Sequence, residues 1–372
     1  MLNATRDIPF FNYRKAFLKD EEQYSAIFHD VMRRGAFIDQ QDLKDFEARV
    51  AGYLGVKHAI GVGNATDGLV MCWRCASLNP GDEVLFPSHT MVASPASVHF
   101  AGGVPVPVEI GDDGLMDPDA LESALTSKTV GVMPVQLNGR TCDMDRIGAF
   151  ADKHELVIIE DSAQALGSQF KGKFASTFGL CAAFSFYPAK ILGCMGDGGM
   201  VVTDSDEVAE QLHLLRDHGR GSDGEVHRWG INSRLDNLQA AILDFQFKNY
   251  QTIIDRRREI ASMYDERLSD LAELKLPPKP GASPDHFDVF QNYEMQAERR
   301  DELCAYLREQ GIGTLVQWGG KAVHQWKGLG FEVSLPKTEA FFERCVMIPM
   351  NMTLEDDDVE YIAGHVRRFY RA

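Results

Sequence analysis

A lysine whose surroundings favour an uncharged amine lies near the middle of the sequence. Lys190 ends the segment Phe184-Ser-Phe-Tyr-Pro-Ala-Lys190, and the apolar, glycine-rich run Ile191-Leu-Gly-Cys-Met-Gly-Asp-Gly-Gly199 follows it. Apolar surroundings disfavour the ammonium form, and the neutral amine is the form that attacks a carbonyl to make a Schiff base. Ser185, at the end of a predicted strand, adds a hydroxyl that suits a phosphate. Most loop lysines are simply solvated, so Lys190 needs support from other motifs.

Two other segments place polar groups at a helix start and at a strand end. The turn Gly61-Val-Gly-Asn-Ala-Thr-Asp-Gly68 precedes an apolar helical stretch, and helix N-terminal amides bind phosphate. The plain alternative is a capped helix, with Asn64 or Thr66 as the cap. In Leu156-Val-Ile-Ile-Glu-Asp-Ser-Ala-Gln164, an aspartate closes an apolar strand and a glutamine comes three positions later. Asp161 suits a protonated ring nitrogen, although a helix cap, a metal ligand or a ribose ligand is the commoner role.

Together the three segments supply the contacts that pyridoxal phosphate (PLP) needs from a protein. The turn and Ser185 would hold the phosphate, Asp161 the pyridine nitrogen and Gln164 the ring hydroxyl, while Lys190 would bind the cofactor covalently. All three segments belong to one predicted β-α-β framework. The combination therefore predicts a PLP enzyme, which no single motif would indicate alone.

The chain resembles the DegT/DnrJ/EryC1/StrS family of sugar aminotransferases, which have PLP fold type I. The resemblance runs from about Ile8 to the C-terminus. Its specific motifs are Asn64-Ala-Thr-Asp-Gly68, Pro80-Gly-Asp-Glu-Val84, Glu160-Asp-Ser-Ala-Gln164, Phe184-Ser-Phe-Tyr-Pro-Ala-Lys190, Gly196-Asp-Gly-Gly199 and Gly230-Ile-Asn-Ser-Arg-Leu235. The resemblance implies an α/β fold, with a mostly parallel mixed sheet flanked by helices in a large domain and a smaller C-terminal α/β domain.

The resemblance also implies a role for each matched position. Lys190 and Asp161 would be catalytic. The cofactor-binding residues would be Ala65, Thr66, His89, Met91, Asp161, Gln164, Ser185, Lys190 and Asn232. Asn232 would reach the phosphate bound to the other subunit, which implies a homodimer with shared active sites. The substrate-binding residues would be Phe37, Ile38, Tyr187, His227, Arg228 and Gln317, although interface packing or exposed loop charge explains Phe37, Ile38, His227 and Arg228 equally well.

Two positions depart from the family pattern. The family usually stacks an aromatic residue on the cofactor ring in the segment that matches Pro87-Ser-His-Thr-Met-Val92. Here Met91, with His89 nearby, would have to cover the ring. The family's His-Tyr-Pro segment in the C-terminal domain is replaced by Gln317-Trp-Gly319. The substrate contacts of relatives therefore do not transfer directly to this chain.

Short apolar runs alternate with helical segments between about Lys57 and Asp204, which is the pattern of a mostly parallel sheet. The predicted strands are Glu83–Phe86, Val104–Ile110, Val130–Leu137, Leu156–Glu160, Ala182–Phe186 and Met200–Thr203, and the predicted helices include Asp143–His154, Asp206–Arg216 and Tyr250–Leu271. Ligands of such sheets bind beyond the carboxyl ends of the strands. A proline-rich connector over Leu276–Pro284 follows the long helix. We predict a large domain over residues 1–248 and a small domain over residues 249–372.

Composition argues against several classes of protein. A formal net charge of −17 argues against a nucleic-acid partner, and no apolar run is long enough to span a bilayer. The segment Met1–Phe10 carries early charges and no apolar stretch, so no secretory signal is predicted. Seven scattered cysteines suit a reducing compartment, which predicts a cytoplasmic protein. Cys72-Trp-Arg-Cys75 lies in a predicted helix without a second pair, and the histidines lack ligand spacing, so no metal is predicted.

These observations predict a PLP-dependent aminotransferase for a nucleotide-linked keto-sugar. A 3-keto or 4-keto 6-deoxyhexose is the expected acceptor and glutamate the donor that the family implies, in glycan or natural-product biosynthesis. Because Lys190 is kept, transamination is favoured over the dehydration that family members with histidine at this position carry out. Two alternatives stay open. One is an aminotransferase for cyclitols or an amino-keto aromatic precursor, and the other is a non-catalytic regulator that binds PLP or a sugar nucleotide.

Overall fold

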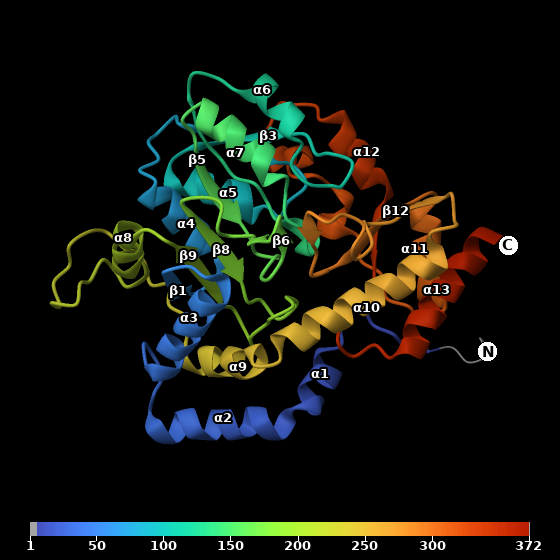
Figure 1. Ribbon diagram of the computed structural model, residues 1–372, viewed down its shortest axis with the longest axis horizontal. Helices are drawn as coiled ribbons and strands as arrows, with labels where there is room; N and C mark the ends of the chain where they lie inside the picture. Colours follow the sequence, from blue (N-terminus) through green and yellow to red (C-terminus); the bar gives the residue numbers. More distant parts are fainter. Residues whose placement is uncertain (1–5, 372) are drawn as a thin grey trace.

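The computed structural model describes residues 6–371 in two α/β units. Residues 1–5, which begin the segment considered for a secretory signal, and residue 372 lie outside the described part. The larger unit surrounds a central sheet, and the smaller unit lies at the right of Figure 1. Helix α10 (Tyr250–Leu268) runs from the first unit to the second.

A seven-stranded sheet forms the centre of the larger unit. Its order is β1 (His58–Val62), β9 (Gly199–Thr203), β8 (Cys181–Ser185), β5 (Val157–Asp161), β4 (Thr129–Val132), β2 (Glu83–Pro87) and β3 (Val104–Val108). The five strands from β8 to β3 are parallel, whereas β9 is antiparallel to both of its neighbours. The Lys190 loop joins β8 to β9 without a crossover helix, so β9 returns in the opposite direction. The predicted mostly parallel mixed sheet is confirmed.

Helices cover both faces of this sheet. One layer contains α4 (Ala65–Cys75), α5 (Ala93–Ala101) and α8 (Asp206–Arg216), and the other contains α3 (Gln41–Leu54), α7 (Met144–Lys153) and α9 (Asn237–Phe247). Successive residues of β8 show the division, because Ala183 packs in the α4 layer while Ala182 and Phe184 pack in the α3 layer. Burial on both faces explains why the strand sequences are continuous apolar runs.

The smaller unit is built on a three-stranded antiparallel sheet. Its strands are β10 (Leu274–Lys275), β12 (Tyr293–Ala297) and β13 (Cys345–Ile348), and α10, α11 (Arg300–Glu309) and α13 (Asp356–Arg371) pack around its core. Ile8 belongs to the same core, and α12 (Pro336–Arg344) returns to the large unit, where Thr338 donates a hydrogen bond to Glu109. These contacts cross the predicted boundary between residues 248 and 249, which stays a prediction.

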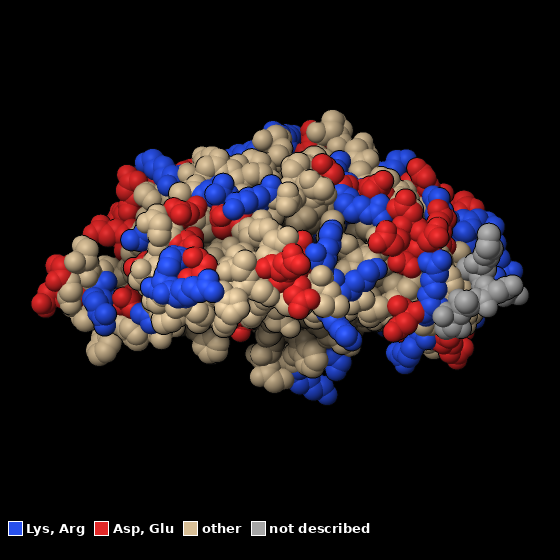
Figure 2. Space-filling view, turned by 90° about the horizontal axis from the view of Figure 1, so that it is seen from below, with Lys and Arg blue, Asp and Glu red and all other residues tan. Residues whose placement is uncertain are grey.

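Further helices and strands complete the two units. They are α1 (Tyr13–Lys19), α2 (Glu21–Arg34), α6 (Leu121–Ala124), the hairpin β6 (Gln169–Phe170) and β7 (Lys173–Phe174), and β11 (His286–Phe287), which pairs with β6; within residues 6–371, five short 3-10 helices lie in the connections. Helices α1 and α2 lie along the lower edge in Figure 1. Acidic and basic side chains are interspersed over the face shown in Figure 2.

Several element boundaries differ from the sequence-based expectation. Strand β1 was not predicted at all. The expected strand Val130–Leu137 ends at Val132, because Pro134 has no N–H with which to continue the ladder. The expected helix Tyr250–Leu271 ends at Leu268, whereas Asp206–Arg216 forms as predicted. Cys72 and Cys75 are buried in α4, and all seven cysteines are buried and unpaired.

Candidate active site

A cavity of about 290 Å³ opens at the carboxyl end of the central sheet. We call it the strand-end pocket. The ends of β5 and β8, the loops after β2 and β4, and the N-terminus of α4 form its wall. Eight residues predicted from the sequence line it: Ala65, Thr66, Met91, Asp161, Gln164, Ser185, Tyr187 and Lys190. The structure therefore brings together, in one pocket, groups that are more than 100 positions apart in the chain.

Lys190 lies in the loop between β8 and β9, at the wall of the strand-end pocket. Its backbone N–H donates to the carbonyl of Tyr187 (2.8 Å). Burial lowers the pKa of the Lys190 amine from 10.5 to about 8, and the nearby Asp161 carboxylate acts in the opposite direction. The lowered pKa leaves about a tenth of the amine neutral at pH 7, far more than for a solvated lysine, which supports the nucleophilic amine that the sequence predicted.

Asp161 ends β5 and is only 5% exposed. Its Oδ2 accepts a hydrogen bond from Ser94 Oγ (2.6 Å), and its Oδ1 accepts one from the backbone N–H of Ala163 (3.1 Å). Burial raises the pKa of the Asp161 carboxyl, while Ser94, Ala163 and the Lys190 charge lower it. A positively charged partner in the pocket would favour the ionised form. Sequence reasoning missed Ser94, because an isolated serine in a helix carries no spacing signal.

The N-terminus of α4 provides the anion-binding end of the strand-end pocket. Asn64 caps the helix by accepting a hydrogen bond from the backbone N–H of Asp67 (2.9 Å), so the capping interpretation holds. The Ala65 and Thr66 region then faces the pocket beside the Ser185 hydroxyl. Gly199 lies against this turn, since a Cβ there would come within 2.5 Å of the Asn64 carbonyl carbon. Only glycine lets β9 approach the turn so closely.

Gln164 is oriented by contacts outside the pocket. Its Oε1 accepts a hydrogen bond from the backbone N–H of Asn138 (2.9 Å), which leaves the side-chain NH₂ as the free donor. Asn138 has a φ of 54°, a left-handed conformation that asparagine tolerates better than most residues. Its own carboxamide accepts from Asn292 (2.8 Å) and donates to Glu294 (2.6 Å). The Asn138-Gly139 dipeptide is a turn signal that sequence analysis did not use.

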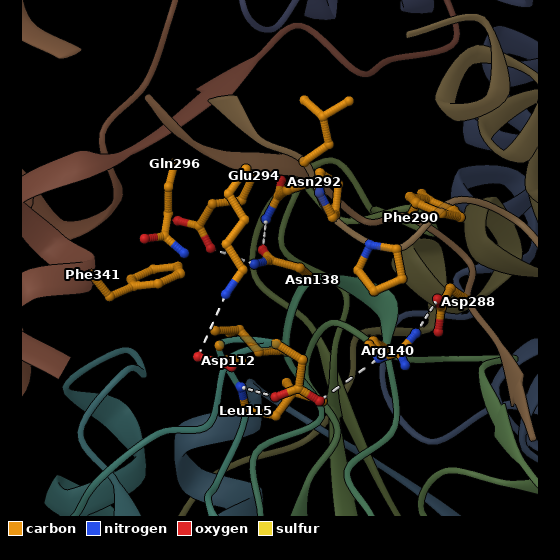
Figure 3. A pocket seen from close by; sticks show the side chains of 17 residues that line it. Asp112, Leu115, Asn138, Arg140, Asp288, Phe290, Asn292, Glu294, Gln296 and Phe341 are labelled. Atoms are coloured by element: carbon orange, nitrogen blue, oxygen red, sulfur yellow. Dashed lines mark hydrogen bonds and ion pairs between the residues drawn. The ribbon is translucent and has the colours of Figure 1, made fainter. Parts of the chain in front are cut away.

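A second cavity, of about 60 Å³, adjoins the strand-end pocket, and Asn138 belongs to its wall (Figure 3). Figure 3 shows Asn138 between Asn292 and Glu294, with the Arg140–Asp288 ion pair (2.6 Å) at the other side. Leu137 lines both cavities. The polar groups that hold Gln164 therefore extend from the central sheet into the smaller unit.

Two predicted residues lie outside the strand-end pocket because their polar groups face elsewhere. His89 is 1% exposed, and its Nδ1 lies 2.7 Å from the Gly114 carbonyl while its Nε2 lies 3.2 Å from Glu294. Gln317 is 4% exposed and donates to Asn138 Oδ1 (3.2 Å). Neither side chain is among those that line the pocket, and the roles of His89 as ring cover and Gln317 as substrate ligand stay predictions. Met91 and Trp318, the neighbour of Gln317, do line the pocket.

The residues expected to act across a dimer interface do not line the pocket of their own chain. Phe37 and Ile38 are exposed between α2 and α3. His227 forms an ion pair with Asp223, and the Arg228 guanidinium donates a hydrogen bond to Gln211 (3.0 Å). His227 and Arg228 belong to the loop after α8, which projects at the left of Figure 1. Their roles stay predictions, as does that of the exposed Asn232.

The chemistry of the donor set fits PLP. A helix N-terminus and hydroxyls suit the phosphate, a buried carboxylate suits a pyridinium nitrogen, and an amide NH₂ suits the ring hydroxyl. Lys190, with its lowered pKa, completes the set. Within residues 6–371, no group of three or more His, Cys, Asp or Glu side chains is arranged to hold a metal ion. In the same range, no helix combines the length and apolarity needed to cross a membrane.

Fold and pocket together define an α/β enzyme of the PLP-dependent transferase type. The chain belongs to the DegT/DnrJ/EryC1/StrS aminotransferase family, which it matches over residues 18–367. PLP is the cofactor of this family, and solved relatives include PLP and pyridoxamine phosphate forms. The predicted family, fold type, aminotransferase class and cofactor are confirmed.

Three similar proteins show the range of the family. A pleiotropic regulatory protein of Geobacillus stearothermophilus is 36% identical over 370 residues, covering 98% of this chain and 99% of its own. A dTDP-3-amino-3,4,6-trideoxy-alpha-D-glucose transaminase of Streptomyces venezuelae is 37% identical over 370 residues, covering 98% and 97%. The crystal structure of S. venezuelae DesV has a TM-score of 0.94 at 36% identity, covering 99% of this chain and 100% of its own. The prediction of a nucleotide-sugar aminotransferase agrees with the named transaminase.

Proposed function

We propose that this protein transfers an amino group to the keto carbon of a nucleotide-linked sugar, with a 3-keto 6-deoxyhexose as the acceptor. The observation that carries the proposal is one pocket that joins Lys190, Asp161 and the N-terminus of α4. The transaminase relative named for a dTDP-linked 3-amino sugar supports the choice of carbon. A 4-keto sugar is the nearest competing acceptor.

The pocket residues have distinct tasks in this reaction. Bound PLP supplies an electron-accepting ring and a carrier for the amino group. Lys190 would hold the cofactor covalently, and its free amine would move the proton at the reacting carbon. Asp161, held by Ser94, keeps positive charge on the ring nitrogen by ion pairing. Gln164 donates to the ring hydroxyl, and Ala65, Thr66 and Ser185 bind the phosphate.

A homodimer with shared active sites is the assembly we propose. Trp229 is 94% exposed and Val226 is 65% exposed on the loop that also carries His227 and Arg228. Large exposed apolar side chains mark protein interaction surfaces. In the dimer, Asn232 would reach the partner's phosphate, and Phe37 and Ile38 would complete the partner's substrate wall.

The amino donor and the compartment are further parts of the proposal. Glutamate is proposed as the donor from the family resemblance. The cytoplasm is proposed as the compartment because all seven cysteines are free thiols, which persist in reducing surroundings.

A half-reaction screen tests the function. The PLP-loaded protein is first incubated with glutamate, and the loss of the visible cofactor band is followed. After removal of glutamate, nucleotide-linked 3-keto and 4-keto sugars are added separately, and the return of the band and the aminated product are measured. We expect the 3-keto sugar to restore the band faster. No return with any keto-sugar would refute the proposed acceptor class.

A regulatory role is the second candidate, because one relative is called a pleiotropic regulatory protein. A purely regulatory binder would retain PLP but show no change of the cofactor band with any amino donor. The first half-reaction therefore separates the two functions. A matched control is the Lys190→Ala protein, in which donors should not bleach the band because the amine that moves the proton is absent.

A further inference from the structure

One buried carboxamide holds the backbone on both sides of Lys190. The backbone N–H of Ile191 donates to Gln291 Oε1 (2.7 Å), and Gln291 Nε2 donates to the Ala189 carbonyl (2.8 Å). Gln291 is only 4% exposed, so water does not compete for these two bonds. The side chain thus uses its donor and its acceptor together on the two residues that flank the lysine.

The two bonds restrain the direction in which the Lys190 side chain leaves the backbone. The Ala189 carbonyl belongs to the peptide group before the Lys190 Cα, and the Ile191 N–H belongs to the peptide group after it. Holding both peptide planes fixes φ and ψ of Lys190, since these are the two soft dihedrals between them. The Lys190 N–H bond to Tyr187 supports the first plane. Because φ and ψ of Lys190 are fixed, its side chain always leaves the backbone in the same direction.

Gln291 is itself anchored from the smaller unit. The guanidinium of Arg257, in α10, donates to the carbonyls of Phe290 (2.9 Å) and Gln291 (3.0 Å). Gly139 packs directly against this segment, because a Cβ there would lie 2.6 Å from the Gln291 backbone nitrogen. Gln291 also precedes Asn292, which holds Asn138 and through it the Gln164 side chain. The segment Phe290–Asn292, just before β12, thus contacts both the Lys190 loop and the loop that carries Asn138.

We propose that Gln291 is a positioning residue that sets the backbone of Lys190 for covalent attachment of the cofactor. The inference rests on the proposed role of Lys190 and adds a residue that does not touch the cofactor. Loss of the clamp leaves the phosphate site of α4 intact, so cofactor is still bound. The amine then samples more directions, and bond formation to it slows.

The chain contains a matched control for this clamp. Gln239, in α9, makes the same pair of bonds to Met195 in the same loop: it accepts from the Met195 N–H (2.9 Å) and donates to the Met195 carbonyl (3.1 Å). Gln239→Leu therefore removes a second carboxamide clamp of the same loop, at a more exposed position and five residues beyond Lys190. A general loosening of the loop would affect both variants alike, whereas positioning of Lys190 would affect Gln291→Leu alone.

The test measures covalent attachment directly. PLP is added to cofactor-free wild type, Gln291→Leu and Gln239→Leu, and the rate of appearance of the visible band is recorded from pH 6 to 9, with borohydride trapping and peptide mapping of the product. We expect Gln291→Leu to attach PLP at least about tenfold more slowly, a barrier increase near 1.4 kcal/mol, with unchanged phosphate-site affinity. Gln239→Leu should stay within about twofold of wild type.

Gln291→Glu keeps the test decisive if Gln291→Leu does not fold. The carboxylate still accepts from Ile191 but repels the Ala189 carbonyl, while the protonated acid donates to it. The attachment rate relative to wild type should therefore recover as the pH falls. A wild-type rate in either Gln291 variant across the whole pH range overturns the proposal, and so does equal slowing in Gln239→Leu. Trapping at a lysine other than Lys190 in wild type would instead refute the proposed function.

Discussion

The inner and outer walls of the strand-end pocket differ in how completely one chain builds them. The inner wall, formed by Asp161, Gln164 and Lys190, lies at the ends of central strands, and its polar groups are held by Ser94, Asn138 and the Gln291 clamp. The outer wall includes Met91 and Tyr187, which are 50% and 51% exposed.

This difference separates a half of the pocket that is buried and held by one chain from a half that stays exposed in that chain. Burial fixes the geometry of the inner wall within one folded chain, because unpaired polar groups would be costly there. The outer wall retains exposed apolar surface that a second chain would cover. Changes to residues of either wall should therefore act on the pocket of their own subunit, whereas a change at Asn232 should act on the partner's pocket.

Removing the inner-wall lysine should have the largest effect. We expect Lys190→Ala to lose at least about 10³-fold in turnover, because it removes both the covalent link and the proton-transferring amine. PLP should still bind through the α4 turn, without a bond that borohydride can trap. The exposed Lys128→Ala protein is the control, and peptide mapping of the trapped wild type should identify Lys190. Retention of a trappable bond in Lys190→Ala would contradict the assignment.

Neutralising the inner-wall carboxylate should have the next largest effect. In Asp161→Asn, the amide no longer pairs with a ring-nitrogen charge, so kcat should fall about a hundredfold, near 2.7 kcal/mol, while PLP affinity changes much less. Asp197→Asn changes a carboxylate of the same pocket and should cost far less. A kcat within about threefold of wild type for Asp161→Asn would leave Asp161 with a structural role only.

Shared sites can be tested by mixing two inactive proteins. Subunits carrying Lys190→Ala and Asn232→Asp are exchanged, and the mixed dimer is isolated with two tags. One of its sites then combines an unchanged Lys190 with an unchanged Asn232 from the partner, so about half of wild-type activity per dimer should return. Both parents must first be shown to be folded, inactive dimers. An inactive mixed dimer would show that Asn232 does not serve the partner's site.

The contrast between residues at strand ends and residues held by tertiary contacts also explains which site residues the sequence could predict. Lys190 and Asp161 were found because each follows a buried strand whose apolar run is visible, and parallel strand ends converge. The α4 turn was found because its small residues open an apolar helical stretch. Ser94, Asn138 and Gln291 were missed because their roles come from tertiary contacts 26 to 100 positions away in the chain, as in the Asn138–Gln164 and Gln291–Ile191 bonds. The contacts of His89 with Glu294 and of Gln317 with Asn138 could not be predicted, because sequence spacing does not show which way a loop side chain turns.

The smallest expected effect is the change in folding stability that accompanies protonation of Lys190. This change depends only on how deeply the inner wall is buried. Burial lowers the pKa of Lys190 from 10.5 to about 8 in the cofactor-free protein. Between these two pH values the unfolded chain binds a proton that the folded chain does not, so this group makes the protein more stable as the pH rises through that window. Below about pH 8 the folded and unfolded states both bind the proton, so the free-energy cost of burying the charged amine lowers the stability in full.

Lys190→Met keeps most of the side-chain length and removes the charge. The cofactor-free variant should therefore melt above wild type at pH 7, by about 1–2 °C for each kcal/mol recovered in a chain of this length, and the difference should shrink toward pH 10. Thermal unfolding of wild type, Lys190→Met and the exposed control Lys128→Met across this range measures the effect. Lys128→Met should show no such pH-dependent difference. If the Lys190→Met difference stayed constant with pH, the Lys190 amine would be solvated in the folded chain, and the inner wall would be as open to water as the outer wall.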